Sequence, residues 1–258
     1  MNILFIGDIY GRPGRSALKK LLPTLKEEIK ADFVIANIEN ASSGVGVTVE
    51  SYQDLKKLGV DVFTSGNHIF DKREIIPVLK DRNEIIIRPA NFQEGTPGRG
   101  VWTGEIGTTK LAVVNLMGRV FMREGLEDPF RAADRILTDL KDCVVIIDFH
   151  AEATSEKRAF GYYVDGRASA VIGTHTHVPT ADAQMLPKGT AYITDVGFTG
   201  PQESVLGVDK EVIIHNFLTS PSAPFEVAGG DVEIGAVVIK TKGKKVSSIE
   251  HIRRIFEL

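Results

Sequence analysis

The chain alternates between short apolar runs and stretches in which apolar residues recur every three or four positions. The apolar runs predict strands over residues 2–6, 33–38, 61–64, 85–88, 110–116 and 144–149. The helical spacing predicts helices over residues 15–29, 49–58, 71–80, 128–140 and 154–165, and Pro23 predicts a kink or break in the first of them. Strands that alternate with helices favour a βαβ architecture.

The pattern changes after His177, where apolar runs follow one another without intervening helical spacing. Residues 191–196, 211–217, 233–240 and 246–254 predict antiparallel strands, and Lys242-Gly243-Lys244 predicts a hairpin turn between the last two. The chain shows no internal repeat, low-complexity segment or linker. We therefore expect one α/β domain over residues 1–258, built from two packed sheets with helices outside them.

Polar residues of the kinds that bind metals follow five of the apolar runs. They are Asp8, Glu39, Asn40, Asn67, His68, His150, His175 and His177. Taken singly, several of them have a structural interpretation as a helix cap, a turn residue or a buried core histidine. In open α/β sheets, however, ligands bind beyond the carboxyl ends of the strands, and all eight residues fall at such ends. Together they predict a metallohydrolase.

The most informative motif is His175-x-His177, which ends the apolar run that begins at Ala170. Two imidazoles at positions i and i+2 cannot share a face of an ideal strand, but a turning loop can direct both at one or two ions. Glu39 is costly to bury unpaired, and its two carboxylate oxygens can bridge two cations.

The other candidates divide by their chemistry. Asp8 offers a carboxylate after a glycine, and Asn40 and Asn67 offer neutral amide oxygens, although Asn40 is equally well explained as a turn former. His150 follows a core strand and is a metal ligand only in the company of the others. His68 is free to act as an acid or base near a bound substrate.

Three further features carry weaker signals. The loop that contains Arg12 and Arg15 leads into a helix and could contact a phosphate, but it lacks the spacing of a P-loop. His215 and His251 lie in the expected C-terminal strands and have structural roles. Substrate-binding residues cannot be named from the sequence.

Bulk properties narrow the class of protein. The chain has 258 residues, 43% of them hydrophobic, with a net charge of −3. This charge argues against an extensive nucleic-acid surface, and no apolar stretch is long enough to cross a membrane. The N-terminal residues begin a strand and show no signal peptide. We expect a soluble, cytoplasmic protein and leave a homo-oligomer open.

Five stretches resemble the calcineurin-like metallophosphoesterase superfamily, and more closely its YmdB-type bacterial branch. They cover residues 6–15, 37–41, 65–71, 148–152 and 173–177. Within the wider superfamily the sequence differs in three places: Tyr10 replaces a histidine, Glu39-Asn40 replaces a Gly-Asp-x-x-Asp motif, and Thr174 separates a glycine from the first histidine of the last motif. The YmdB-type branch is similar in all three respects.

The resemblance implies a four-layer α/β/β/α sandwich and a dinuclear site. One metal would be held by Asp8, Glu39, Asn40 and His177, and the second by Glu39, Asn67, His150 and His175, with Glu39 bridging them. The resemblance suggests iron, with manganese as a substitute.

The implied activity is hydrolysis of small phosphodiesters, in particular cyclic nucleotides of the 2′,3′ kind and also the 3′,5′ kind. A hydroxide that bridges the metals would attack phosphorus, and His68 would donate a proton to the leaving oxygen. Two alternatives stay open. One is a phosphomonoesterase, either a 5′-nucleotidase or a phosphoprotein phosphatase, and the other is a slow-turnover regulator that senses nucleotides.

Overall fold

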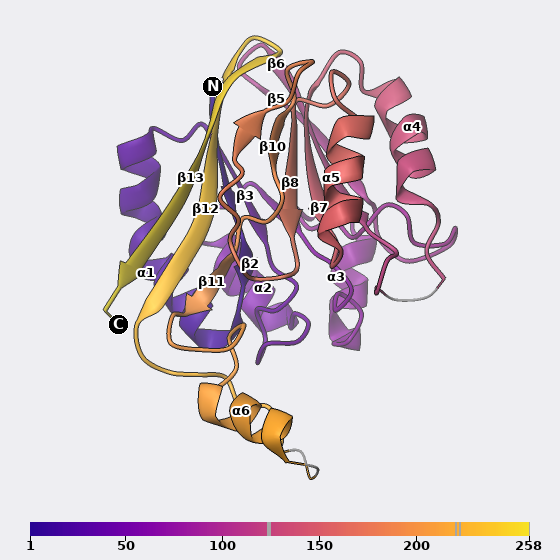
Figure 1. Ribbon diagram of the computed structural model, residues 1–258. Coiled ribbons are helices and arrows are strands. Elements are labelled where there is room, and N and C mark those ends of the chain that lie inside the picture. Colours follow the sequence, from indigo (N-terminus) through magenta and orange to yellow (C-terminus); the bar gives the residue numbers. More distant parts are fainter. Residues whose placement is uncertain (123–124, 220, 222, 258) are drawn as a thin grey trace.

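Two β-sheets form the centre of the molecule. The strands are β1 (Asn2–Ile6), β2 (Asp8–Ile9), β3 (Phe33–Asn37), β4 (Val62–Thr64), β5 (Val101–Ile106), β6 (Thr109–Met117), β7 (Val144–His150), β8 (Ala170–Thr174), β9 (Gln184–Met185), β10 (Ala191–Ile193), β11 (Phe198–Pro201), β12 (Val232–Lys242) and β13 (Lys245–Phe256). The computed structural model describes residues 1–122, 125–219, 221 and 223–257 (Figure 1). One sheet has the order β2-β11-β12-β1-β3-β4, with β13 paired to β12, and the other has the order β5-β6-β7-β8-β10-β9.

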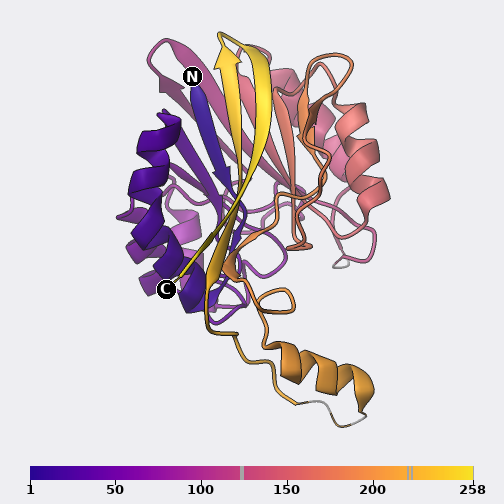
Figure 2. The same ribbon diagram turned by 60° about the vertical axis from the view of Figure 1, so that its left-hand side comes forward.

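Helices cover the outer faces of both sheets, as Figure 2 shows. They are α1 (Gly11–Ile29), α2 (Val49–Lys56), the 3₁₀ turn η1 (Arg73–Ile75), α3 (Ile76–Lys80), α4 (Pro129–Asp139), α5 (Thr154–Tyr163) and α6 (Lys210–Leu218). Helix α6 is the exception, because it projects away from the sheets and buries none of its residues (Figure 1).

Alternation along the strands divides the interior into three apolar layers. In β1, Leu4 and Ile6 pack with Leu18 of α1, whereas Ile3 and Phe5 face the second sheet. A third layer lies between the second sheet and helices α4 and α5, and it includes Phe160. Two sheets that share a core and carry helices outside them confirm the expected four-layer α/β/β/α sandwich.

Parallel pairing brings the functional ends of the strands to one edge. Strands β1, β3 and β4 pair in parallel, and so do β6, β7 and β8. Asn37 of β3 donates to Asp148 of β7 at 3.0 Å, and the backbone N–H of Ser65, just beyond β4, donates to Asn115 of β6 at 3.1 Å. These buried hydrogen bonds join the two sheets beneath the edge where their strands end.

Some local expectations are wrong. Residues 211–217 form helix α6 rather than a strand, because Asp209 caps the helix by accepting from the backbone N–H groups of Glu211 and Val212. Strand β10 pairs in parallel with β8, although it is antiparallel to β9. Residues 85–88 form only a bridge between Ile86 and Phe63.

Other expectations hold with shifted boundaries. Helix α1 begins at Gly11 and continues through Pro23 to Ile29, so the break considered at Pro23 does not occur. The last two strands form the predicted antiparallel hairpin around Gly243, which has a positive φ of 59°. Among the described residues, no helix is long and apolar enough to cross a bilayer.

Candidate metal centre and active site

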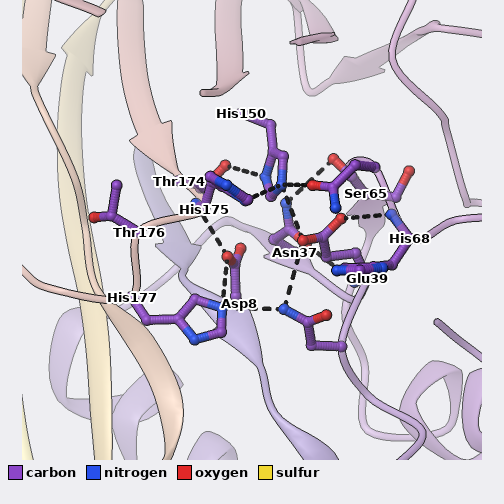
Figure 3. A network of polar contacts seen from close by, with 12 residues as sticks. Asp8, Asn37, Glu39, Ser65, His68, His150, Thr174, His175, Thr176 and His177 are labelled. Atoms are coloured by element: carbon purple, nitrogen blue, oxygen red, sulfur yellow. Dashed lines mark hydrogen bonds and ion pairs between the residues drawn. The ribbon is translucent and has the colours of Figure 1, made fainter. Parts of the chain in front are cut away.

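The structure brings all eight predicted residues together where the two sheets end side by side. Asp8 lies in β2, and His150 is the last residue of β7. The remaining six lie in the segments that follow β3, β4 and β8. Figure 3 shows the side chains from these separate segments converging on one another.

Glu39, His150 and His175 form the tightest cluster. His150 Nε2 lies 2.9 Å from Glu39 Oε1, 3.1 Å from His175 Nδ1 and 3.1 Å from Asn67 Oδ1. The ligand atoms of the two histidines and the glutamate all lie within 4.8 Å of one another. Nitrogen and oxygen donors this close, contributed by three segments, suit a metal ion of intermediate hardness.

A second group lies beside the first. His177 Nε2 is 3.2 Å from Asp8 Oδ2 and 3.0 Å from Asn40 Nδ2. Asn40 Nδ2 in turn lies 3.5 Å from Glu39 Oε1, so Glu39 is next to both groups. This placement agrees with the predicted division into two ligand sets around Glu39, although the bridging role itself stays a prediction.

Two observations indicate that these residues fit metal ions. Asp8 Oδ1 and Asn40 Oδ1 are buried and have no hydrogen-bond partner, an arrangement that costs free energy unless a cation compensates it. A Cβ placed on Gly66 would come within 2.2 Å of both Glu39 Oε2 and His150 Nε2. The absent side chain therefore leaves the space in which the ligand atoms meet.

Hydrogen bonds fix the orientation of two of the candidate ligand rings. His150 Nδ1 lies 2.9 Å from Thr174 Oγ1, whose hydroxyl donates to Asp148 at 2.6 Å. His177 Nδ1 lies 2.9 Å from the carbonyl oxygen of Leu206. In both rings Nδ1 therefore carries a proton, and Nε2 is the atom that can offer a lone pair to a metal. Thr174, which separates the glycine from the histidines, thus orients the ring of His150.

The charges in the site interact strongly. Burial opposes ionisation of Asp8, but the hydrogen bond with His177 and the nearby imidazoles outweigh it and hold the pKa of Asp8 below its usual value. Burial would lower the pKa of His150, yet the carboxylate of Glu39 raises it to about 9. Burial, together with the charge of His150, lowers the pKa of His175 to about 3. Any metal that binds must therefore displace a proton from His150.

His68 lies apart from the ligand cluster, at its open side. Its backbone N–H donates to Glu39 Oε2 at 3.2 Å, and its Nδ1 lies 2.7 Å from Asp71 Oδ2. One third of the side chain is exposed, in contrast to the buried Glu39 and His150. Because Asp71 holds Nδ1, the other ring nitrogen is available to a substrate.

The His175-x-His177 loop is held in an unusual backbone conformation. His175 has a φ of 97° and His177 a φ of 63°, in a region that non-glycine residues rarely adopt. Between them, Thr176 donates from its backbone N–H and its hydroxyl to Asp195 Oδ2, at 3.1 and 2.8 Å. Lys157 forms a buried ion pair with the same oxygen at 2.6 Å.

Sequence reasoning missed these supporting residues. Asp148 begins one of the five stretches that carry the resemblance, two residues before His150, but its supporting role is not evident from the sequence, and nothing in the spacing of Asp195 and Lys157 ties them to the metal motifs. A buried charge is the signal that could have identified them, and it appears only once the fold is known. Asp71 lies three residues after His68, within helical contact distance, and could have been noticed.

Among the weaker candidates, Arg15, His215 and His251 make structural contacts. The Arg15 guanidinium donates to the carbonyl oxygen of Ala41. Neither Arg12 nor Arg15 lines the cavity beside His68. His251 contacts the carbonyl oxygen of Val196 at 3.0 Å, and His215 contacts the hydroxyl of Thr219 at 3.1 Å, on helix α6 rather than in a strand.

A four-layer sandwich with histidine, carboxylate and amide side chains at its carboxyl edge is the arrangement expected of a metallophosphoesterase. The chain belongs to the YmdB-like protein family, which matches residues 4–255. A 2′,3′-cyclic-nucleotide 2′-phosphodiesterase of Bacillus subtilis (strain 168) is 50% identical over 256 residues, covering 98% of this chain and 96% of the relative.

Two solved structures share the fold over nearly their whole length. A hypothetical protein from Thermus thermophilus superposes with a TM-score of 0.93 at 45% identity, covering 100% of this chain and 99% of that one. A phosphatase from Mycoplasma pneumoniae superposes with a TM-score of 0.94 at 36% identity, covering 100% and 94%. The names of the Bacillus and Mycoplasma proteins confirm the predicted enzyme class, a phosphoric ester hydrolase.

Proposed function

We propose that this chain is a phosphodiesterase that hydrolyses 2′,3′-cyclic nucleotides at the bond between phosphorus and the 2′-oxygen. The observation that carries the proposal is the pair of adjacent ligand groups, Glu39–His150–His175 and Asp8–Asn40–His177, beside a partly exposed His68. The 50% identity to a 2′,3′-cyclic-nucleotide 2′-phosphodiesterase supports the substrate. The 3′,5′-cyclic nucleotides are a second substrate class to compare.

The residues present would hold two metal ions, for which we propose iron, with manganese as the substitute. Asp8, Glu39, Asn40 and His177 would form one site, and Glu39, Asn67, His150 and His175 the other. When bound, such ions neutralise charge on the phosphate oxygens and lower the pKa of water to give a nucleophile at neutral pH. The protein contributes a rigid set of donors whose orientation is fixed by Thr174, Asp148 and Leu206.

We propose that His68 donates the proton that the departing 2′-oxygen requires. Its Nδ1 is held at 2.7 Å by the carboxylate of Asp71, which orients the ring. Nε2 is then the proton-carrying atom that faces the substrate. General acid assistance of this kind contributes about 10²- to 10⁴-fold to the rate.

The experiment that tests the proposal compares three substrates with metal-loaded protein: 2′,3′-cyclic AMP, 3′,5′-cyclic AMP and 5′-AMP. Chromatography of the products should show 3′-AMP from the first substrate and little or no adenosine from the third. Release of adenosine from 5′-AMP as the main reaction would contradict the proposal and favour a nucleotidase. Tight binding of 2′,3′-cyclic AMP without product would favour a regulator.

The His68→Ala variant separates catalysis from metal binding. We expect it to retain its metal content, because the side chain of His68 does not belong to either ligand group, while turnover of 2′,3′-cyclic AMP falls by at least about 10²-fold. A variant with wild-type turnover would remove His68 from the mechanism.

A further inference from the structure

An exposed phenylalanine lies at the edge of the proposed active site. Phe121 belongs to the segment that follows β6, and its side chain is 87% exposed. Its φ of 61° lies in the region that bulky residues avoid. Such a residue contributes little to the apolar core and strains the backbone, so its presence is not explained by folding.

The backbone that leads to Phe121 is nevertheless firmly held. The N–H of Gly118 donates to the carbonyl oxygen of His150 at 3.0 Å. The N–H groups of Arg119 and Val120 donate to the carboxylate of Glu156 in helix α5, at 2.9 to 3.1 Å. The segment is thus tied directly to a proposed metal ligand, and an exposed ring on anchored backbone is already organised for contact with another molecule.

Phe121 shares a cavity with the catalytic residues. A cavity of about 400 Å³ is lined by Asn67, His68, Asp71, Phe121, Met122 and His175. Its volume falls within the range of about 300–1,000 Å³ typical of small-ligand sites. Its lining combines the proposed proton donor and metal ligands with an aromatic ring and a thioether. A molecule that filled it would therefore meet both polar and apolar groups.

We propose that Phe121 and Met122 form the platform on which the nucleobase of the substrate packs. This inference rests on the proposed function, because a nucleotide joins a phosphodiester to a planar base. An aromatic platform is tolerant of base identity, since every base has a π-face, so purine and pyrimidine substrates are both accommodated. Phe121 is then a specificity residue that distinguishes nucleotides from phosphodiesters without a base.

The test uses two five-membered cyclic phosphodiesters, 2′,3′-cyclic AMP and glycerol 1,2-cyclic phosphate, which has neither base nor ribose. Alanine substitution of a stacking residue costs the equivalent of about 5- to 150-fold in affinity. We expect Phe121→Ala to lower kcat/KM for 2′,3′-cyclic AMP by this factor, mainly through KM, and to leave kcat/KM for glycerol 1,2-cyclic phosphate unchanged. Phe121→Trp, which keeps an aromatic face, should retain the activity on the nucleotide.

Phe217→Ala is the matched control, because Phe217 is 85% exposed but lies on α6 and outside this cavity. This variant should leave kcat/KM unchanged for both substrates. Equal effects of Phe121→Ala on both substrates, or no effect on either, would overturn the platform while leaving the phosphodiesterase in place. A wild-type protein that hydrolyses neither substrate would overturn the proposed function, and the platform with it.

Discussion

Replacement of Lys157 by methionine is the sharpest single perturbation of the scaffold beneath the site. Lys157 Nζ lies 2.6 Å from Asp195 Oδ2 and 2.7 Å from the carbonyl oxygen of Thr174, and the side chains of Lys157 and Asp195 are each 1% exposed. Asp195 also accepts from Thr176, the residue between the two loop histidines. Lys157→Met preserves most of the side-chain volume and leaves the Asp195 carboxylate buried without its cation.

The expected loss in the free energy of unfolding follows from the burial of this ion pair. Removing one partner of a buried ion pair costs about 3–5 kcal/mol, because the remaining charge is left uncompensated. A protein of this kind has a free energy of unfolding of about 5–15 kcal/mol, so the loss is a large fraction of the total. The remaining hydrogen bonds to Asp195, from Thr176 and from the N–H of Gly197, reduce this loss. They do not remove it, because neither donor carries a positive charge.

Urea unfolding followed by circular dichroism measures this cost, and metal titration of the folded variant measures its consequence for the site. We expect weaker metal binding, because Asp195 holds the strained loop that positions both histidines. Lys210→Met is the control, since Lys210 forms an ion pair of similar length, 2.8 Å, at an exposed position. Equal stability losses in the two variants would refute the reasoning, and so would wild-type metal affinity in Lys157→Met.

Two further predictions follow from local geometry. Gly66→Ala should fold, because Gly66 has no positive φ. Its Cβ would, however, displace the side chains of Glu39 and His150. Replacing a residue that only supports a metal ligand lowers metal affinity by about 10- to 100-fold, and we expect Gly66→Ala to lower it by more. Glu84→Gln tests an ion pair away from the site: the hydrogen bond from Lys56 lowers the pKa of Glu84 below 4.5. A lowered carboxyl pKa stabilises the folded state above that pH, so the wild type should exceed the variant in free energy of unfolding at pH 7, and the difference should shrink as pH falls below 4.5.

The sequence predicts the layers of this fold well because strands that are buried on both faces are nearly continuous apolar runs. In β1, four consecutive apolar residues serve two different cores, and only their alternation is needed to assign them. A similar apolar run at residues 212–214 does not form a strand, because its three residues belong to the exposed helix α6. Periodicity cannot distinguish a strand from a helix over so short a run.

The eight candidate site residues could be named from the sequence because parallel strands place their carboxyl ends at one edge of a sheet. The residues that support them could not, because their partners are distant in the chain. Lys157 and Asp195 are 38 residues apart, and Asn37 and Asp148 are 111 residues apart. The two positive φ values at His175 and His177 are also a consequence of this tertiary support rather than of local propensity.

The measurement that tests the central claim most directly is a manganese titration of metal-free protein, with bound metal and hydrolysis of 2′,3′-cyclic AMP followed together. The account predicts that hydrolysis appears as metal binds, that both saturate at two ions per chain, and that chelation abolishes both. Hydrolysis that is indifferent to chelation, or saturation with metal without any hydrolysis, would contradict it.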